Sequence, residues 1–395
     1  MKKIVLYGTG FAGEKFYCAY KKRYEIVYAI DQKNDKYFHG IPVYSLEEKR
    51  NYLKDYFIIV ATETVFVYDE ISCLLKECGL VEFENYEPAE LVNRELMILY
   101  GNCHMRILKN YLQAHLEFER RFLIRYFYVA DENENKRYPT DNELSHCKVL
   151  VLQDLKQHND LNVPSGEEVQ KKTSVGCEII KIPNLYGCNL FFPQVGERYK
   201  KALDTEALER HIHENKNLPQ DKNHKVAAEY VIGCRDENIE RMLKKGSSEE
   251  EIRNMIENEN VYDSDIIIQN FQQEMEKLKR RENYCDIIIS DYIEKNYKKK
   301  QLFYDPGHPT NVVIYEKGNK ILEILNIETD EKIREGWGEE ALDDGEMFIY
   351  GCVKRALKLK FCQKYIRRYK SRGTLYGTAI NLQEYIRGYI AWLID

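Results

Sequence analysis

Short apolar, β-branched runs alternate with helical patterns along much of this chain, and this alternation constrains its fold class. The runs have the length and composition of strands, and they span Lys3–Tyr7, Glu25–Ile30, Tyr56–Ala61, Met97–Tyr100, Phe122–Val129, Lys148–Gln153 and Glu178–Ile182. Strands that alternate with helices are typical of a mostly parallel sheet covered by helices. The sequence therefore predicts an α/β fold.

The chain is long enough for about two domains, and the strand pattern restarts near Met97. We expect a first domain over residues 1–95 and a second over residues 96–395. The second is predicted to contain a charged, helix-rich insertion over 236–300, a short strand over Gln301–Tyr304 and a helix over Asn311–Leu325.

The first predicted strand is followed by glycines with the spacing G-x-G-x-x-G, namely Gly8, Gly10 and Gly13. Asp31 closes the second strand, about where dinucleotide-binding folds place an acid that binds ribose. We expect a Rossmann-like turn here, with a nucleotide, NAD or a nucleotide-sugar as the ligand. The alternative is a shortened module that packs, docks or senses without a dinucleotide.

Cys103 lies where the run Met97–Tyr100 gives way to an amphipathic helical pattern. Such a turn exposes a side chain, and the helix N-terminus favours a thiolate or a developing oxyanion. Cys103 is therefore the candidate nucleophile; the alternative is one of 11 mostly buried thiols. Next to it, Asn102 either orients an oxyanion or stabilises the turn. His104 is a secondary binding candidate.

The strongest candidate for a general base among the nine histidines is His308. Asp305 precedes it by three residues, in a loop held by Pro306 and Pro309. Its carboxylate is placed to orient the imidazole, as a catalytic triad requires. The alternative is an ordinary loop histidine that follows an Asp-Pro turn.

Two further strand ends carry polar residues that a parallel sheet would bring to the same edge. Gln153 ends one strand, while Gly187 and Asn189 follow the strand Glu178–Ile182. A backbone N–H from Gly187 and an amide from Asn189 are suited to an oxyanion hole. A purely structural role is the alternative for each of these residues.

The composition excludes several classes of protein. A net charge of −6 gives no electrostatic argument for binding nucleic acid. The cysteines form no CxxC pair and no signal peptide is evident, which indicates reduced thiols and a cytoplasmic protein. No apolar run is long enough to span a membrane. No histidines, cysteines or acids have the spacing that is typical of a zinc site. We expect His211 and His213 to face solvent.

The segment from Val353 to Arg372 is rich in lysine and arginine and contains no acid. Apolar residues are interleaved with these charges, so the pattern predicts a basic amphipathic helix near the C-terminus. Such a helix either makes peripheral contact with an anionic membrane or binds phosphates. A solvated charged face is the alternative.

Three blocks together resemble the WcbI family of capsular polysaccharide biosynthesis proteins. They are Gly101-Asn102-Cys103, the segment Ile182–Tyr186, and Leu302–Tyr304 with His308-Pro309-Thr310-Asn311. The resemblance covers about residues 97–365. It implies a three-layer SGNH-hydrolase-like α/β fold that binds coenzyme A, with Cys103 where SGNH enzymes carry serine. Asp305 and His308 match the Asp-x-x-His block of those enzymes.

The resemblance also implies an activity, the transfer of acetyl from acetyl-coenzyme A to a sugar in surface polysaccharide synthesis. His308 would be the general base, Asp305 its orienting residue, and Cys103 the acyl carrier or a contact on the oxyanion side. The alternatives are an SGNH-like carbohydrate esterase and a non-catalytic assembly protein that binds coenzyme A or a nucleotide. Residues 1–95 resemble short Rossmann units attached to enzymes of surface-glycan assembly. The oligomeric state is not predicted.

Overall fold

The computed structural model of the protein describes residues 1–32, 36–129, 138–153, 163–185, 187–195, 236–330, 332–333, 346–368 and 378–394. The chain forms two compact units, each made of several segments. Unit 1 comprises Met1–Tyr100, Leu116–Val151 and Gln157–Ile179, and unit 2 comprises Gly101–His115, Leu152–Lys156 and Ile180–Asp395. The boundary expected near residue 95 stays a prediction. His211 and His213, expected to face solvent, lie outside the described residues.

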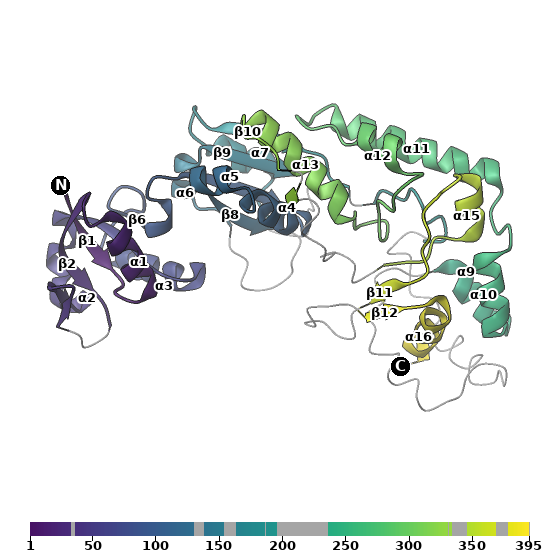
Figure 1. Cartoon of the computed structure of the whole chain (residues 1–395), viewed down its shortest axis with the longest axis horizontal. Coiled ribbons are helices and arrows are strands. Elements are labelled where there is room, and N and C mark those ends of the chain that lie inside the picture. Colours follow the sequence, from purple (N-terminus) through teal and green to yellow (C-terminus); the bar gives the residue numbers. More distant parts are fainter. Residues whose placement is uncertain are drawn as a thin grey trace. The chain divides into compact units, whose positions relative to one another are not determined.

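A six-stranded sheet with the order β3-β4-β2-β1-β5-β6 forms the N-terminal part of unit 1 (Figure 1). Its parallel strands are β1 (Lys2–Tyr7), β2 (Tyr24–Ile30), β4 (Ile41–Tyr44), β5 (Phe57–Val60) and β6 (Tyr86–Pro88). The short β3 (Tyr37–Phe38) is antiparallel to β4. Between the strands lie α1 (Phe11–Tyr20), α2 (Leu46–Lys49), η1 (Arg50–Asp55), α3 (Val65–Glu77) and, after β6, η2 (Ala89–Leu91). The three strands predicted here are confirmed.

The two faces of this sheet are buried against different helices. Ile4 and Leu6 of β1 pack in one cluster with Phe16 of α1, whereas Val5 packs in a second cluster with Tyr68 of α3. Successive side chains of a strand point to opposite faces, so a strand covered on both faces reads as a continuous apolar run. This explains why the run at the N-terminus shows no polar alternation.

A second sheet has four strands in the order β10-β9-β7-β8. The strands are β7 (Glu95–Gly101), β8 (Phe122–Tyr128), β9 (Val149–Gln153) and β10 (Glu178–Ile182), which confirms the four strands predicted in this part of the chain. The nearby helices are α5 (Leu116–Arg121), α6 (Asp141–His146) and α7 (Gly166–Lys171). The last residues of β7, β9 and β10 belong to unit 2.

Within unit 1, Arg125 of β8 lies in a buried ionic cluster. Its guanidinium donates to Glu82, 3.2 Å away, and to Glu143 of α6. The ring of Tyr68 lies 5.0 Å from the guanidinium carbon, and the Tyr68 hydroxyl donates to Glu82 at 2.7 Å. Because each carboxylate is buried and paired with the same cation, the cluster avoids the large cost of an isolated buried charge.

Unit 2 is mainly helical. It contains α4 (His104–Gln113), α9 (Glu237–Lys244), α10 (Glu249–Glu257), α11 (Ser264–Glu282), α12 (Ser290–Asn296), α13 (Asn311–Ile324), α15 (Gly351–Ala356) and α16 (Leu382–Ile394), with a small antiparallel pair of β11 (Ile366–Arg368) and β12 (Thr378–Ile380). The charged insertion and the helix after residue 311 are therefore confirmed. None of the described helices is both long and apolar enough to span a bilayer.

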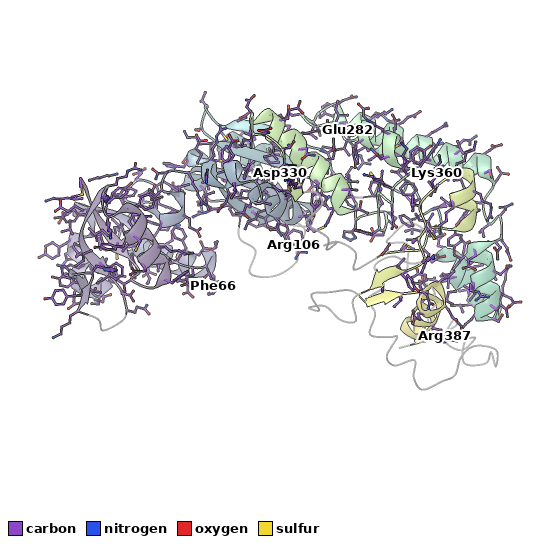
Figure 2. All side chains as sticks on the ribbon, in the orientation of Figure 1. Phe66, Arg106, Glu282, Asp330, Lys360 and Arg387 are labelled. Carbon is purple, nitrogen blue, oxygen red and sulfur yellow. The ribbon has the colours of Figure 1, made fainter. Side chains whose placement is uncertain are left out.

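Specific contacts hold these helices together. Tyr111 of α4 stacks on Tyr315 of α13 with ring centroids 4.5 Å apart. Gly318 of α13 permits this packing, because a Cβ there would lie 2.4 Å from a ring carbon of Tyr111. Glu282, labelled in Figure 2, accepts the backbone N–H of Ser290 at 2.9 Å and so caps α12. Arg387 of α16 pairs with Glu249 at 3.0 Å.

Two predictions about local structure are wrong. Residues Gln301–Tyr304 form no strand but one isolated bridge, between Phe303 and Pro309, because the proline-containing loop folds back on itself. The basic segment from Val353 to Arg372 does not form one helix: α15 ends at Ala356, and Lys358 adopts a left-handed conformation with φ of 54°.

One basic residue of that segment, Arg355, has structural partners. The Arg355 guanidinium donates to the backbone oxygens of Glu257 at 3.3 Å and Asn258 at 2.9 Å, at the C-terminal end of α10. The free carbonyls of a helix C-terminus carry partial negative charge. Arg355 therefore stabilises the end of α10, and contact of the basic segment with a membrane or with phosphates stays a prediction.

Candidate active site

Cys103 lies in the turn between β7 and α4, as the sequence predicts. Gly101 ends β7, and Cys103 is the N-cap residue of α4 with its side chain partly exposed. A Cβ at Gly101 would lie 2.6 Å from Oε1 of Gln153 and 2.8 Å from Cγ of Met105. The turn thus requires glycine at this position because β7 and the first turn of α4 approach closely.

The carboxyl ends of β7, β9 and β10 are joined by amide side chains. Gln153 accepts the backbone N–H of Asn102 at 2.8 Å through Oε1, and its Nε2 donates to Oδ1 of Asn184 at 3.1 Å. Asn102 Nδ2 also lies 3.4 Å from Oδ1 of Asn184. The sequence analysis placed Gln153 and Asn102 at this edge. The structure shows that both hold the Cys103 turn in place.

His104 is buried and connects this turn to the loop that carries His308. One ring nitrogen, Nε2, lies 3.1 Å from the carbonyl oxygen of Gly307, and Nδ1 lies 3.5 Å from Nε2 of Gln153. Burial, followed by the positive charges of Lys317 and His308, lowers the pKa of His104 well below its ordinary value. A neutral ring with the proton on Nε2 satisfies both contacts. His104 therefore acts as a structural link.

Asp305 holds the imidazole of His308. The Nδ1 atom of His308 lies 2.8 Å from Oδ2 of Asp305, whose side chain is 0% exposed. The other carboxylate oxygen accepts the backbone N–H groups of Gly307 and His308. These bonds fix both the carboxylate and the ring, and a catalytic role for Asp305 stays a prediction.

The predicted nucleophile and base interact, because Cys103 is among the groups that raise the pKa of His308. Burial disfavours the charged imidazole, but the hydrogen bonds with Asp305 and Cys103 outweigh burial and raise the pKa of His308 to about 10. Since Nδ1 is bonded to Asp305, Nε2 is the ring nitrogen left for proton exchange with a reacting group. The arrangement suits nucleophilic catalysis at an acyl carbon.

Two cations bind the loop that follows β10, and the sequence did not predict either of them. Lys317 of α13 is buried and donates to the carbonyl oxygen of Pro183 at 2.8 Å. Arg281 donates to the carbonyl oxygen of Asn184 at 2.9 Å. Burial lowers the pKa of Lys317 to about 8. Lys317 lies among the apolar positions of the helix predicted after residue 311, and a lysine at such a position is a sign of a buried charge. Arg281 lies among many other charged residues of its helix, so its sequence position does not single it out.

Gly187 and Asn189, the predicted oxyanion donors, follow β10. Gly187 is exposed, with a φ of 77° that favours glycine. Asn189 carries a buried Oδ1 that has no hydrogen-bond partner in the described part of the chain. Their role at an oxyanion stays a prediction.

The glycine-rich turn in unit 1 is formed by close backbone contacts. Gly8 has a φ of 103°, and a Cβ there would lie 2.3 Å from the carbonyl oxygen of Ala61. A Cβ at Gly13 would lie 2.2 Å from the carbonyl oxygen of Gly8, while Gly10 is the N-cap residue of α1. Steric fit therefore explains two of the three glycines.

Asp31 is bound to the same turn. Its Oδ2 accepts the backbone N–H of Thr9 at 2.7 Å and the Thr9 hydroxyl at 2.6 Å. The carboxylate thus fixes the loop between β1 and α1. Ribose binding by Asp31 stays a prediction.

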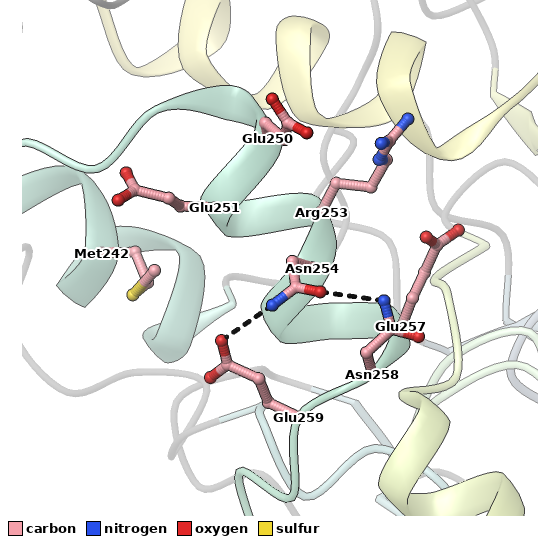
Figure 3. A pocket seen from close by; sticks show the side chains of 8 residues that line it. All are labelled: Met242, Glu250, Glu251, Arg253, Asn254, Glu257, Asn258 and Glu259. Atoms are coloured by element: carbon pink, nitrogen blue, oxygen red, sulfur yellow. Dashed lines mark hydrogen bonds between the residues drawn. The ribbon is translucent and has the colours of Figure 1, made fainter.

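A separate cavity of about 410 Å³ in unit 2 is acidic (Figure 3). Glutamates 250, 251, 257 and 259 line it, and Arg253 is its basic residue. It combines no nucleophile with a base. Across the described residues, no group of histidines, cysteines and acids is arranged to hold a metal ion.

Comparison with known proteins supports the resemblance seen in the sequence. The model of the family described as polysaccharide biosynthesis enzyme WcbI matches residues 96–330, more than half of the chain. These residues include Cys103, Gln153, Asp305 and His308. No curated protein matches the chain.

One solved structure is similar in fold, with a TM-score of 0.51, 16% sequence identity, and coverage of 76% of this chain and 90% of that chain. It is described as WcbI, a novel polysaccharide biosynthesis enzyme, in a native form without a disulfide bond between coenzyme A and a cysteine of that protein. At this identity the similarity shows a shared fold, and the predicted α/β class is confirmed.

Proposed function

This chain belongs to the WcbI family of polysaccharide biosynthesis enzymes, and we propose that it transfers an acetyl group from acetyl-coenzyme A to a sugar hydroxyl. The acceptor would be a sugar or a polysaccharide precursor. The observation that carries the proposal is the ring of His308, which is held by buried Asp305 at 2.8 Å and whose pKa is raised in part by Cys103. A nucleophile, a base and an orienting carboxylate are the parts that acyl transfer needs.

Acyl transfer would proceed in two steps. His308 holds the proton at neutral pH, and Sγ of Cys103 attacks the carbonyl carbon of the acetyl thioester. The bond from that carbon to the sulfur of coenzyme A breaks, and His308 gives its proton to the leaving sulfur. His308 then takes the proton of the sugar hydroxyl, whose oxygen attacks the acetyl carbon. Cys103 leaves as the thiolate, and His308 again holds the proton.

The interaction between Cys103 and His308 would also make the pKa of His308 differ between the two steps. Part of the rise in the pKa of His308 comes from its hydrogen bond with Cys103 and from the negative charge there. Acetylation of the sulfur removes both contributions. The pKa of His308 then falls toward the range of an effective general base, at the stage when the sugar hydroxyl must lose its proton.

Coenzyme A as the source of the acetyl group fits the residues present. Cys103 is partly exposed at the N-terminus of α4, where a thioester could reach its sulfur. The similar solved structure is described with reference to a disulfide between coenzyme A and a cysteine. We propose that Cys103 is the counterpart of that cysteine.

Two finer points of the fold belong to this proposal. For the family region we propose an SGNH-like arrangement, with Cys103 in the place of the serine.

For residues 1–95 we propose a Rossmann-like module. Its five parallel strands lie side by side in the order β4-β2-β1-β5-β6. If these strands are numbered 1 to 5 along the chain, this is the order 3-2-1-4-5 that is typical of the Rossmann fold. A nucleotide, NAD or nucleotide-sugar is the proposed ligand of its glycine-rich turn. Thermal-shift assays with each compound on the full chain test this point.

The main test is incubation of the protein with acetyl-coenzyme A and a panel of free sugars. We expect release of the coenzyme A thiol and one acetyl group on a sugar, both lost in Cys103→Ala and His308→Gln. Cys18→Ala, which changes an exposed cysteine of α1, is the control that keeps activity. Hydrolysis of p-nitrophenyl acetate without transfer to any sugar would support a carbohydrate esterase. Retained acetylation in both site variants would contradict the proposed mechanism.

A further inference from the structure

Two lysine-rich segments that are far apart in the sequence lie side by side in unit 2. The first, residues 298–300, follows α12, and the second, residues 358–364, follows α15. The backbone N–H of Lys360, which is labelled in Figure 2, donates to the carbonyl oxygen of Lys298 at 2.7 Å. The fold thus joins part of the basic segment near the C-terminus to a second basic segment with which no sequence pattern connects it.

A buried carboxylate also holds these two segments together. Oε1 of Glu346, which is 6% exposed, accepts the side-chain amide of Gln301 at 2.8 Å and that of Gln363 at 3.3 Å. Gln301 directly follows the first segment, and Gln363 lies within the second. Because the segments share a backbone hydrogen bond and a buried acceptor, their positions relative to each other are fixed.

The lysine side chains of both segments are exposed, whereas Leu357 and Gln363 beside them are buried. We call the exposed side chains the basic patch; they are Lys298, Lys299, Lys300, Lys358, Lys360 and Lys364. Neither segment contains an acid. Among the described residues no acid forms an ion pair with the basic patch, whereas Lys279 of α11 is paired with Glu294 at 2.6 Å. The basic patch therefore concentrates positive charge on a chain whose net charge is −6.

We propose that the basic patch binds an anionic lipid surface. Each lysine near such a surface raises the affinity about five-fold, so several lysines together give peripheral contact. Tyr365 follows the last lysine of the patch and is 60% exposed. A tyrosine ring with its hydroxyl suits the boundary between lipid headgroups and hydrocarbon. The site is separate from the acyl-transfer residues, and the inference does not depend on the proposed function.

The side chains of the basic patch are all lysines, which favours a lipid surface over nucleic acid. Arginine is the residue preferred for nucleic-acid phosphates, because its planar guanidinium binds them through two hydrogen bonds of fixed geometry. A lysine carries a point charge on a flexible side chain. Such charges suit a diffuse layer of headgroups, in which no single anion has a fixed position.

The test is co-sedimentation of the full chain with vesicles of phosphatidylcholine that contain about 30% phosphatidylserine. Vesicles of phosphatidylcholine alone are the lipid control. We expect binding to the anionic vesicles only. The binding should weaken as the salt concentration rises from about 0.05 M to about 0.3 M, because salt screens exposed charges.

A triple variant tests the residues of the basic patch. Lys298→Gln, Lys300→Gln and Lys360→Gln combined should lower the affinity for the anionic vesicles about 100-fold. Replacement of the same three lysines by arginine keeps the charge and should retain binding. The matched control combines Lys22→Gln, Lys171→Gln and Lys244→Gln, which removes the same charge from exposed lysines of other parts of the chain. This control should bind like the unaltered chain, and thermal unfolding verifies that each variant is folded.

The proposal is overturned if the unaltered chain does not bind the anionic vesicles at low salt. It is also overturned if the glutamine variant of the basic patch and the matched control bind equally well. Binding of a double-stranded DNA oligonucleotide that depends on the basic patch, without binding to the vesicles, would assign the patch to nucleic acid and would overturn the proposal as well.

Discussion

Nδ1 of His308 lies 2.8 Å from Oδ2 of Asp305, a carboxylate with no exposed surface. This contact leaves Nε2 as the ring nitrogen available to a reacting group, and it is one of the causes that raise the pKa of the imidazole. The consequences for activity can be measured separately from those for stability.

Asp305→Asn should lower kcat/KM for acetyl transfer about 10³-fold or more, because loss of the orienting carboxylate misplaces the proton on the imidazole. The pKa of His308 should fall in the same variant, since the hydrogen bond and the charge of Asp305 both raise it. Steady-state kinetics and NMR titration of the His308 ring check the two effects. A variant with lower activity but an unchanged His308 pKa would show that Asp305 acts only structurally.

His308 should make the stability of the fold dependent on pH. Its folded-state pKa of about 10 lies above the ordinary value of 6.5, so the charged ring stabilises the folded state. This contribution is fully present below about pH 6.5 and is lost as the pH rises toward 10. Urea unfolding of the unaltered chain and of His308→Gln should therefore give a stability difference that shrinks across this interval.

Lys317 titrates in the opposite sense and must be separated from His308. Its pKa is lowered from 10.5 to about 8 by burial, so its contribution makes the fold more stable as the pH rises from 8 to 10.5. Lys317 is present in both proteins of the His308 comparison, and its effect cancels in the difference. A difference that does not change with pH would contradict the assigned charge of His308.

Gln153→Leu should disturb the site without removing a reacting group. It leaves the buried N–H of Asn102 without its acceptor, which costs about 1–3 kcal/mol of unfolding free energy. Displacement of the Cys103 turn by about 1 Å should lower kcat roughly 10²-fold. Gln272→Leu on the exposed face of α11 is the matched control, with an expected effect within about 0.5 kcal/mol. Equal unfolding free energies in the two variants would argue against the amide network.

Arg125→Met should destabilise unit 1 strongly, because it leaves the buried carboxylates of Glu82 and Glu143 without their shared cation. Breaking such a buried pair costs about 3–5 kcal/mol. Arg121→Met removes an exposed pair with Glu95 at 3.3 Å and should cost no more than about 1 kcal/mol. Denaturant unfolding measures the loss of unfolding free energy in each variant. Similar losses in the two variants would show that the buried ionic cluster contributes no more to stability than an exposed ion pair.

The strands and the candidate residues at the strand ends are predictable for a common physical reason. Parallel strands buried on both faces leave continuous apolar runs, and reactive residues of α/β proteins follow the carboxyl ends of such strands. Cys103 and Gln153 were found in this way. Asp305 and His308 were found from their spacing within a loop.

The features that the sequence did not predict depend on tertiary contacts, which cannot be recognised from the sequence pattern of a single segment. The run before Asp305 resembles a strand, but it pairs with its own loop, as the 2.9 Å bond from Tyr304 N–H to the His308 carbonyl shows. The basic segment resembles a helix, but Arg355 binds the end of α10 and Lys358 breaks the helix. Asn184 can bind Gln153 at the end of β9 only because β10 lies next to β9 in the sheet.

The most direct measurement is the intact mass of the protein after brief exposure to acetyl-coenzyme A without a sugar, followed by an acid quench. We predict one added acetyl group, located on Cys103 by peptide mapping, absent in Cys103→Ala and discharged when the acceptor sugar is added before the quench. A Cys103→Ala protein that still acetylates the sugar at the rate of the unaltered chain would contradict the account.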